Sequence, residues 1–446
     1  MVAAGARRLY SIAPMRAIRA DLLDFVDTPV WGDPFSAAVR WRPDHWLLIG
    51  DDGRIAGVQP GDHPPGTEWT CDDQRGRLLL PGFIDAHVHS AQLEVIASYG
   101  TELLDWLHRH AFPAERAFAD PEVAAAGAAR FLDALLAHGS TSAVVFPTVH
   151  KVSAEALFTA AHERGMRIVA GKVLMDRHAP DGLRDQVAQA GRDCIDLIQR
   201  WHGRGRSRYA VTVRFAPTST PAQLAMAGEL LRADPSLHFQ THVAENRAEL
   251  RWVRELFPAA RSYLDVYARA GLLHRRGVLA HGIWLEEGDL PVLRDSGAHI
   301  AFCPSSNLFL GSGLLDWPVL ADAGVGVSMA SDVGGGTSLS MQRTLADGYR
   351  VQALGGRRLT AWCALHAATR GAARQLQLDD EIGRLEPGLM ADLCLWDWAV
   401  GAVDARRQQV ARDLHEKVFA WMMLSDERHL AATWVAGRRL YIRSPS

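Results

Sequence analysis

The feature of the chain that most constrains its fold is an alternation of strand-like and helix-like segments through its middle. Eight short apolar runs are rich in β-branched or aromatic residues and are bounded by glycine, proline or polar turns. Helical patterns such as 121–139 and 153–165 lie between them, and each of these two ends in a glycine, a common helix stop. Eight strands that alternate with helices predict an α/β fold, a closed parallel (β/α)8 barrel of the TIM type. The eight runs are 82–89, 142–149, 167–175, 209–217, 238–245, 277–285, 299–306 and 326–332.

The segments that flank the barrel predict a small β-sandwich-like domain formed by both chain termini. Near the N-terminus, the DDG triplet at 51–53 is typical of a hairpin turn between two strands. Near the C-terminus, 391–398 and 432–443 are again strand-like. Both ends therefore contribute strands to one unit beside the barrel. The expected boundaries are 15–76 and 379–446 for the two parts of this small domain and 77–378 for the barrel.

The segment 1–14 is expected to be either a disordered extension or the result of an upstream choice of start site. It contains Arg7 and Arg8, and the first acidic residue of the chain is Asp21, a pattern that can mimic an organelle transit peptide. The stretch that begins at Met15, however, is typical of a natural first strand. The folded part of the chain is therefore expected to start there.

Composition and charge exclude several classes of protein. The chain has 446 residues, 22% of them charged, and a formal net charge of -3, so it lacks the concentrated basic surface that binding to nucleic acid requires. No apolar run reaches the roughly 18 residues that span a bilayer, so no membrane partner is expected. The five cysteines are scattered and never form a C-x-x-C pair, which argues against a disulfide framework and predicts a cytoplasmic location.

Four histidines and one aspartate recur at the same end of the predicted strands. His87 and His89 are two apart on the first strand, so they share a face and can point into the barrel mouth, where barrel enzymes keep their active sites. His242, His281 and Asp332 lie near the ends of the fifth, sixth and eighth strands. Neutral imidazoles and a carboxylate suit a divalent ion of the zinc type, with one coordination position left for water.

Five segments together resemble the signature of the amidohydrolase superfamily, whose parts appear here in order. The resemblance extends from about residue 45 to the end and implies a barrel with a small β domain. It implies His87, His89, His242 and Asp332 as ligands of one divalent metal ion, with zinc expected, and His281 beside the nucleophile. The segments are PGFIDAHVH (81–89), THVAEN (241–246), LAHG (279–282), SD (331–332) and GRLEPGLMADLCLWD (383–397).

Four further segments resemble the guanine deaminase family within that superfamily. This resemblance implies hydrolytic deamination of guanine to xanthine and ammonia in purine catabolism, by a homodimeric enzyme. Gln92 and Arg214 would hydrogen-bond the purine, Phe215 would stack on it, and Glu245 would shuttle protons. The segments are 97–120, 171–183, 213–224 and 301–316.

The catalytic residues that the resemblance implies are Glu245, Asp332 and His281. Glu245 would protonate the ring nitrogen beside the reacting carbon, and Asp332 would accept a proton from the nucleophile. His281 would orient the nucleophile and stabilise developing charge. His242, Glu245 and Asp332 would also contact the substrate.

The residues alone leave other interpretations open for several side chains. Glu245 precedes a helical pattern and is also compatible with a solvated helix start, and Arg214 with a pairing to a structural acid. Trp106 and Phe112 are compatible with either a lid over the purine or plain core. Lys172 falls on the third strand, whereas the lysine that bridges two metals in some amidohydrolases belongs on the fourth, so one metal ion is expected.

Two alternative functions also stay open at this point. One is another aminohydrolase of the superfamily, acting on a different heterocycle or an amidine, which would keep Glu245 and the metal ligands without depending on Gln92 and Arg214. The other is a non-catalytic scaffold with an amidohydrolase-like fold. Such relatives typically lack metal ligands, whereas every ligand position is filled here.

Overall fold

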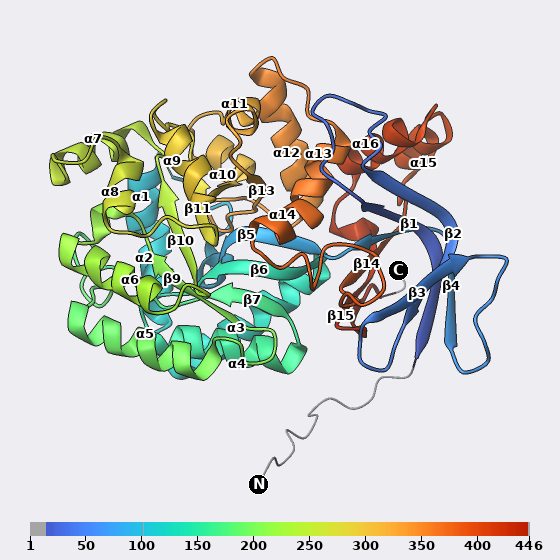
Figure 1. Cartoon of the computed structure of the whole chain (residues 1–446), viewed down its shortest axis with the longest axis horizontal. Helices are drawn as coiled ribbons and strands as arrows, with labels where there is room; N and C mark the ends of the chain where they lie inside the picture. Colours follow the sequence, from blue (N-terminus) through green and yellow to red (C-terminus); the bar gives the residue numbers. More distant parts are fainter. Residues whose placement is uncertain (1–14, 101, 445–446) are drawn as a thin grey trace, which may run out of the picture.

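The computed structural model describes residues 15–100 and 102–444. A barrel surrounded by helices lies beside a separate β-sheet (Figure 1). The predicted extension 1–14 lies outside the described residues.

The barrel consists of parallel strands in the order β5-β6-β7-β9-β10-β11-β12-β13, with the short β8 paired to β9. The first and last strands close the ring through two backbone hydrogen bonds, from Asp332 N to the His87 carbonyl at 2.9 Å and from His89 N to the Val333 carbonyl at 2.8 Å. The predicted (β/α)8 barrel is confirmed. The strands are β5 (Phe83–His89), β6 (Ser140–Phe146), β7 (Arg167–Ala170), β8 (Val173–Leu174), β9 (Arg208–Val213), β10 (His238–Val243), β11 (Gly277–His281), β12 (His299–Phe302) and β13 (Val327–Met329).

Most barrel strands end earlier than the sequence predicts. The run 209–217 leaves the strand ladder after Val213, and the run 238–245 leaves it after Val243. The residues beyond these points are apolar enough to look like strand, but they turn over the barrel mouth. Arg214, Glu245 and Asp332 all lie in such continuations, so the strand ends position the candidate site.

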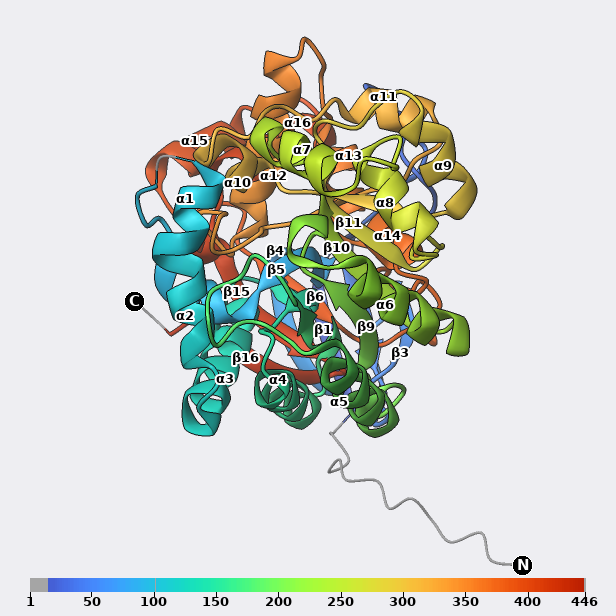
Figure 2. The ribbon, with the colours of Figure 1, turned by 90° about the vertical axis from the view of Figure 1, so that its left-hand side faces the viewer.

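Helices surround the barrel strands, as Figure 2 shows. Their ends follow the expected signals: the Asp120 side chain accepts hydrogen bonds from Glu122 N and Val123 N at the start of α3, and Gly165 ends α4 with a φ of 71°. No helix among the described residues combines the length and the apolar character needed to cross a bilayer. The helices around the barrel are α3 (Pro121–Ala137), α4 (Lys151–Arg164), α5 (Val187–Trp201), α6 (Pro221–Ala233), α7 (Arg247–Leu256), α8 (Tyr263–Arg269), α9 (Asp289–Ser296), α10 (Pro304–Phe309), α11 (Trp317–Asp322), α12 (Met341–Leu354), α13 (Ala361–Ala367) and α14 (Arg370–Gln375).

Additional short helices follow the first barrel strand, the strand β9 and the last barrel helix. The group after β5 contributes to the pocket described below. These elements are η1 (Ser90–Val95), α1 (Leu103–Trp106), η2 (Leu107–Ala111), α2 (Phe112–Ala117), η3 (Ala216–Thr218), α15 (Ala402–Gln409), α16 (Leu414–Leu424) and η4 (Glu427–His429).

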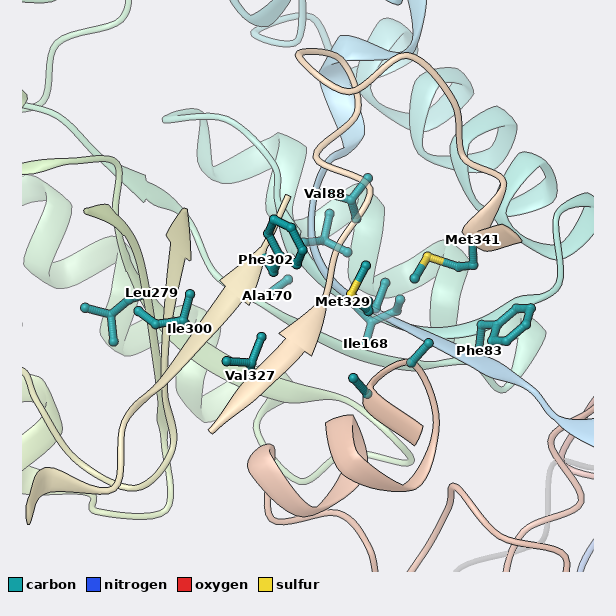
Figure 3. Packing of buried hydrophobic residues seen from close by; sticks show 14 of the residues in the cluster. Phe83, Val88, Ile168, Ala170, Leu279, Ile300, Phe302, Val327, Met329 and Met341 are labelled. Carbon is teal, nitrogen blue, oxygen red and sulfur yellow. The ribbon is translucent and has the colours of Figure 1, made fainter. Parts of the chain in front are cut away.

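The barrel strands separate two apolar clusters, one on each face. Ile168 of β7 and Ile300 and Phe302 of β12 belong to the large outer cluster (Figure 3). Val169 and Ala301, which alternate with them, belong to a smaller inner cluster. This alternation is the period of two that a strand imposes on its side chains. The inner cluster is rich in alanine and valine, which fit the narrow interior of the barrel.

Both chain ends build the second sheet, whose strand order is β16-β15-β14-β4-β1-β2-β3. Figure 1 shows the blue N-terminal strands beside the red C-terminal ones. Only β1 and β4 pair in parallel; the other neighbours are antiparallel, and the predicted turn at 51–53 joins β2 to β3. The predicted domain boundaries themselves stay a prediction. The strands are β1 (Arg16–Phe25), β2 (Val39–Ile49), β3 (Ile55–Pro60), β4 (Thr70–Pro81), β14 (Leu393–Trp396), β15 (Leu430–Val435) and β16 (Arg438–Ile442).

Two buried histidines at the N-terminal ends of barrel strands make the stability of the fold depend on pH. His238 begins β10 and His299 begins β12, and burial lowers the pKa of each to about 3. In the unfolded chain the pKa of a histidine is about 6.5. The unfolded state therefore binds more protons between these two values, so the free energy of unfolding decreases as the pH falls from about 6.5 toward about 3.

We expect His299→Leu to weaken this pH dependence. One differential proton corresponds to about 1.4 kcal/mol per pH unit, so between pH 7 and pH 5 the variant should lose roughly 2 kcal/mol less than the parent. Urea unfolding at both pH values measures this difference. The difference in the free energy of unfolding between parent and variant at pH 7 reports the change in packing. An equal loss of this free energy between pH 7 and pH 5 in parent and variant would contradict the prediction.

Candidate active site

Four side chains converge at the mouth of the barrel. His87 and His89 come from β5, His242 from β10, and Asp332 from the segment after β13. The Nε2 atoms of His87 and His89 are 3.2 Å apart, as are those of His89 and His242. Asp332 Oδ1 lies 3.1 Å from His87 Nε2, and one ligand atom of each residue lies within 4.8 Å of the others. These residues are called the ligand quartet below.

Local irregularities in the backbone bring the quartet together. The pairing of β5 with β6 shifts register between Asp85 and Val88, and such a shift re-aims the side chains that follow it. Asp332 has a φ of 50° and His281 a φ of 73°, left-handed values that residues other than glycine rarely adopt. Strain of this kind is typical of functional sites, where the surrounding structure stabilises it.

The hydrogen bonds and protonation of the quartet fit a bound cation. His242 Nδ1 lies 2.6 Å from the Arg214 carbonyl, which only accepts, so the proton is on Nδ1 and Nε2 keeps a lone pair. Burial lowers the pKa of His87 to about 4 and that of His242 well below its usual value, so both rings are neutral at pH 7.

The remaining ligand of the quartet supplies the negative charge. Burial opposes ionisation of Asp332, but the adjacent rings of His87 and His89, with Nε2 atoms 3.1 and 3.4 Å from its Oδ1, hold its pKa well below the usual range. Three imidazole lone pairs and one carboxylate that meet at a buried point form a metal-binding group of the type that binds divalent transition metals.

Glu245 and His281 lie beside the quartet. Glu245 is buried, which raises the pKa of its carboxyl to about 7, and its Oε1 accepts a hydrogen bond from Ser312 Oγ at 3.0 Å. Its Oε2 lies 3.4 Å from His281 Nε2. Glu245 is therefore not a solvated residue at a helix start, the alternative that the sequence left open.

His281 is held on its other side by Asn307. The Asn307 Oδ1 atom lies 3.0 Å from His281 Nδ1. Burial alone would lower the pKa of His281, but the carboxylates of Glu245 and Asp332 outweigh this effect and raise it. The ring therefore binds a proton more readily than a free imidazole does, and a protonated ring can stabilise negative charge.

Two buried acids that the sequence analysis did not single out support the site. Glu249 accepts hydrogen bonds from the backbone N–H groups of Glu245 and Asn246 and from the Tyr263 hydroxyl, at 3.1, 3.2 and 2.5 Å. Asp85 accepts hydrogen bonds from both the backbone and the hydroxyl of Ser331. The capping box formed by Asn246 and Glu249 at the start of α7 is visible in the sequence as N-x-x-E. Asp85 offers no comparable local signal.

The same pocket also contains the predicted purine contacts. Arg214, Gln92 and Phe215 all line the pocket and are 2, 2 and 5% exposed. Arg214 also forms a buried ion pair with Glu115, with Nη1 at 2.8 and 2.7 Å from the two carboxylate oxygens. The structural acid that the sequence left open as a partner of Arg214 is therefore present, while Arg214 still borders the pocket.

One pocket is lined both by residues of the metal-binding group and by the predicted purine contacts. Trp106 belongs both to the lining and to a buried apolar cluster, whereas Phe112 belongs to that cluster and faces the Arg214 guanidinium. The structure thus brings all the predicted site residues except His87 to one cavity surface, with His87 beneath it in contact with His89 and Asp332. The lining residues are His89, Gln92, Leu103, Trp106, Leu107, Arg214, Phe215, His242, Glu245, Glu249, His281, Leu310, Asp332 and Gly335.

Lys172 and Cys303 are not part of the metal-binding group. Lys172 follows β7 and is buried, and its Nζ lies 2.5 Å from Asp185 Oδ1, so it forms a structural ion pair. Cys303 lies near His281 and Asp332, but burial raises the pKa of its thiol well above the usual value, so it remains protonated. It packs in the inner cluster of the barrel as a small apolar side chain.

Comparison with known proteins identifies the family. The model of the amidohydrolase family matches residues 78–440. The guanine deaminase of Escherichia coli (strain K12) is 41% identical over 433 residues, which cover 96% of this chain and 98% of that protein. The chain belongs to the amidohydrolase family, and within it to the guanine deaminases.

Solved structures of guanine deaminases agree with this assignment. The E. coli enzyme superposes with a TM-score of 0.93 at 41% identity, covering 96% of this chain and 100% of that one. The enzyme from Bradyrhizobium japonicum gives a TM-score of 0.92 at 34% identity, covering 97% and 100%. A guanine deaminase from C. acetobutylicum with guanine bound in its active site has the same fold, with a TM-score of 0.85 at 24% identity and coverage of 96% and 100%.

Proposed function

We propose that this member of the guanine deaminase family converts guanine and water into xanthine and ammonia, with one zinc ion held by the ligand quartet. The observation that carries the proposal is the buried Glu245–His281 pair beside the quartet, in one pocket with Arg214 and Gln92. The guanine deaminases that the chain matches along nearly its whole length support guanine as the substrate.

The donor set of the quartet supports zinc as the ion. Three imidazole nitrogens and one carboxylate oxygen match the ligands that catalytic zinc sites use, with a position left for water. When bound, such an ion supplies a nucleophile at neutral pH, because it lowers the pKa of a water molecule from about 15.7 to about 7.

Glu245 and Asp332 move the protons of the proposed reaction. The pKa of the Glu245 carboxyl is about 7, so this group can take up and release a proton near neutral pH. As the C2–O bond forms, Glu245 delivers one proton of the attacking water to N3, the ring nitrogen beside C2. Asp332 then transfers the second proton from the new hydroxyl to the amine, the C2–N bond breaks, and ammonia leaves behind a C2 carbonyl.

His281 stabilises the charge that develops during this reaction. Its pKa is raised by Glu245 and Asp332, so the ring is available as a cationic hydrogen-bond donor near the reacting carbon. Asn307 holds the ring by its other nitrogen and so fixes its direction.

The purine is proposed to bind against Arg214, Gln92 and Phe215. A guanidinium can donate to the purine oxygen O6, an amide can donate and accept, and an aromatic ring can pack on the flat heterocycle. All three side chains are nearly buried and line the pocket, which strengthens their polar contacts by excluding water.

Arg214→Met should weaken guanine turnover mainly through KM. The loss of a charged hydrogen bond to the substrate predicts a fall in kcat/KM of about 100-fold, with metal content unchanged. Because Glu115 is left buried without its cation, the free energy of unfolding should also fall by about 3 kcal/mol. Steady-state kinetics and urea unfolding measure the two effects, and an unchanged KM would exclude Arg214 as a substrate contact.

The proposed function is tested by incubating zinc-loaded protein with guanine and following the ultraviolet change to xanthine. Adenine, cytosine and an amidine serve as parallel substrates. Turnover of guanine above all others supports the proposal. Activity on another substrate without guanine turnover would be consistent with the proposed metal site but would exclude guanine as the substrate.

A homodimer and a cytoplasmic location are also proposed. The homodimer rests on the resemblance to the guanine deaminase family. The cytoplasmic location is supported by the five cysteines, all of which are free thiols in the described part of the chain.

A further inference from the structure

Glu115 joins three elements that border the pocket, although it does not line the pocket itself. It lies on α2 with 0% of its surface exposed. Arg214 follows β9, and both Glu115 carboxylate oxygens accept hydrogen bonds from its Nη1. Gln92 lies on η1, and its Nε2 donates a hydrogen bond of 2.8 Å to Glu115 Oε1. One buried carboxylate therefore holds both polar side chains among the proposed purine contacts.

The helix that carries Glu115 holds the Arg214 guanidinium in two ways. Glu115 occupies Nη1, and Phe112, one turn earlier on α2, places its ring face 5.1 Å from the Arg214 Cζ atom. A guanidinium that is paired on one nitrogen and packed on an aromatic face has few alternative positions. Its remaining N–H groups are left for the pocket, which Arg214 lines.

Glu115 also fixes the orientation of the Gln92 amide. A carboxylate only accepts hydrogen bonds, so the Gln92 atom that faces it must be the NH2 nitrogen. The Gln92 carbonyl oxygen accepts from Gly334 N at 3.2 Å, which agrees with this orientation. The second N–H of the Gln92 amide is then free to donate to a ligand.

The structure assigns to Glu115 the role of a positioning residue that makes the pocket select purines with an oxygen at C6. This inference rests on the proposed function. With Glu115 in place, the N–H groups of Arg214 and Gln92 are held in fixed positions, and the positive charge of Arg214 is balanced. A 6-oxygen accepts hydrogen bonds from such donors, whereas a substrate without it leaves buried donors unpaired, which is a large penalty.

The test compares guanine with 2-aminopurine, which keeps the reacting C2 amine and lacks the oxygen at C6. The readout is the ratio of the two kcat/KM values, together with KM and kcat for each substrate. In the parent enzyme this ratio should be about 100 or more. Glu115→Gln should lower the ratio at least about tenfold, through a higher KM for guanine and little change for 2-aminopurine.

A matched control separates positioning from general stability. Asp392 and Arg206 form another buried ion pair, with Arg206 Nη1 2.9 Å from Asp392 Oδ1 and side chains that are 3 and 9% exposed. Neither residue lines the pocket. Asp392→Asn should lower the melting temperature and leave the substrate ratio unchanged, because its partners do not touch the purine.

If Glu115→Gln alone does not fold, a double variant still allows the substrate ratio to be measured. Glu115→Gln with Arg214→Met removes both charges of the pair, so no uncompensated charge stays buried. If Glu115 acts by positioning, the double variant should have a substrate ratio as low as that of Arg214→Met alone, or lower where the orientation of the Gln92 amide is also lost. A ratio in the double variant that returns toward that of the parent would contradict the positioning role.

The outcomes also distinguish this inference from the proposed function. If the parent enzyme deaminates guanine and Glu115→Gln keeps the parent ratio, the positioning role is overturned and the function stands. If the parent enzyme does not deaminate guanine, the proposed function fails first and the inference fails with it.

Discussion

Glu245→Gln is expected to lower kcat for guanine deamination by about 1,000-fold while the fold and the metal content stay as in the parent. Glutamine has nearly the same shape, and its amide can still accept the hydrogen bond from Ser312. It cannot take up and release a proton near pH 7, as a carboxyl with a pKa of about 7 can. Removal of a general acid–base group typically costs 100- to 10,000-fold, roughly, and the loss should fall on kcat.

Glu249→Gln is the matched control for this variant. Glu249 is a second buried acid in the same pocket, but it binds the Tyr263 hydroxyl and two backbone N–H groups rather than His281. Its loss should lower stability and reduce kcat by less than about tenfold, because it acts only by holding the backbone at Glu245. Equal losses of kcat in the two variants would show that Glu245, like Glu249, supports the structure of the site and does not transfer a proton. Steady-state kinetics, metal analysis and thermal unfolding give the three readouts.

The barrel and the cluster of histidines at its mouth could be predicted because both follow from local rules, whereas the choice of the four metal ligands within that cluster came from the family resemblance. Strand-like runs bounded by turns define the barrel, and parallel strands present their C-terminal ends on one side. His87 and His89 needed only the two-residue period of a strand, and the structure brings their Nε2 atoms within 3.2 Å. The roles of Gln92 and Arg214 came from the family resemblance, since a lone glutamine or arginine carries no comparable local pattern.

The buried acids could not be found in this way because their partners are distant in sequence. Glu115 and Arg214 are separated by 99 residues, and Asp85 and Ser331 by 246. A single acidic residue in a helical stretch is usually solvated, so burial of Glu115 follows only once tertiary contacts are known. The ends of the strands could not be predicted for the same reason. Whether Val213 is followed by more strand or by a turn over the barrel mouth depends on tertiary contacts at the site.

His242→Leu is expected to abolish both metal binding and activity. His242 supplies one of the three imidazoles of the ligand quartet, and its Nδ1 hydrogen bond to the Arg214 carbonyl aims Nε2 at the others. Leucine has no ligand atom, so the metal content after dialysis should fall from about one ion per chain to well below 0.1. The loss of the ion's contribution to the nucleophile should lower kcat/KM by at least about 10,000-fold.

His238→Leu tests whether this loss is specific to the ligand. His238 lies on the same strand β10, is also buried, and also has a ring nitrogen near a backbone carbonyl, with Nε2 3.0 Å from the Leu376 oxygen. Its replacement leaves that carbonyl without its partner and should lower the melting temperature, because a buried acceptor loses its hydrogen bond. Since His238 lies at the opposite end of the strand from the pocket, its variant should still bind one metal ion per chain and deaminate guanine within about threefold of the parent rate. If His242→Leu kept the metal, or if His238→Leu lost it, the assignment of the quartet as the metal site would be wrong.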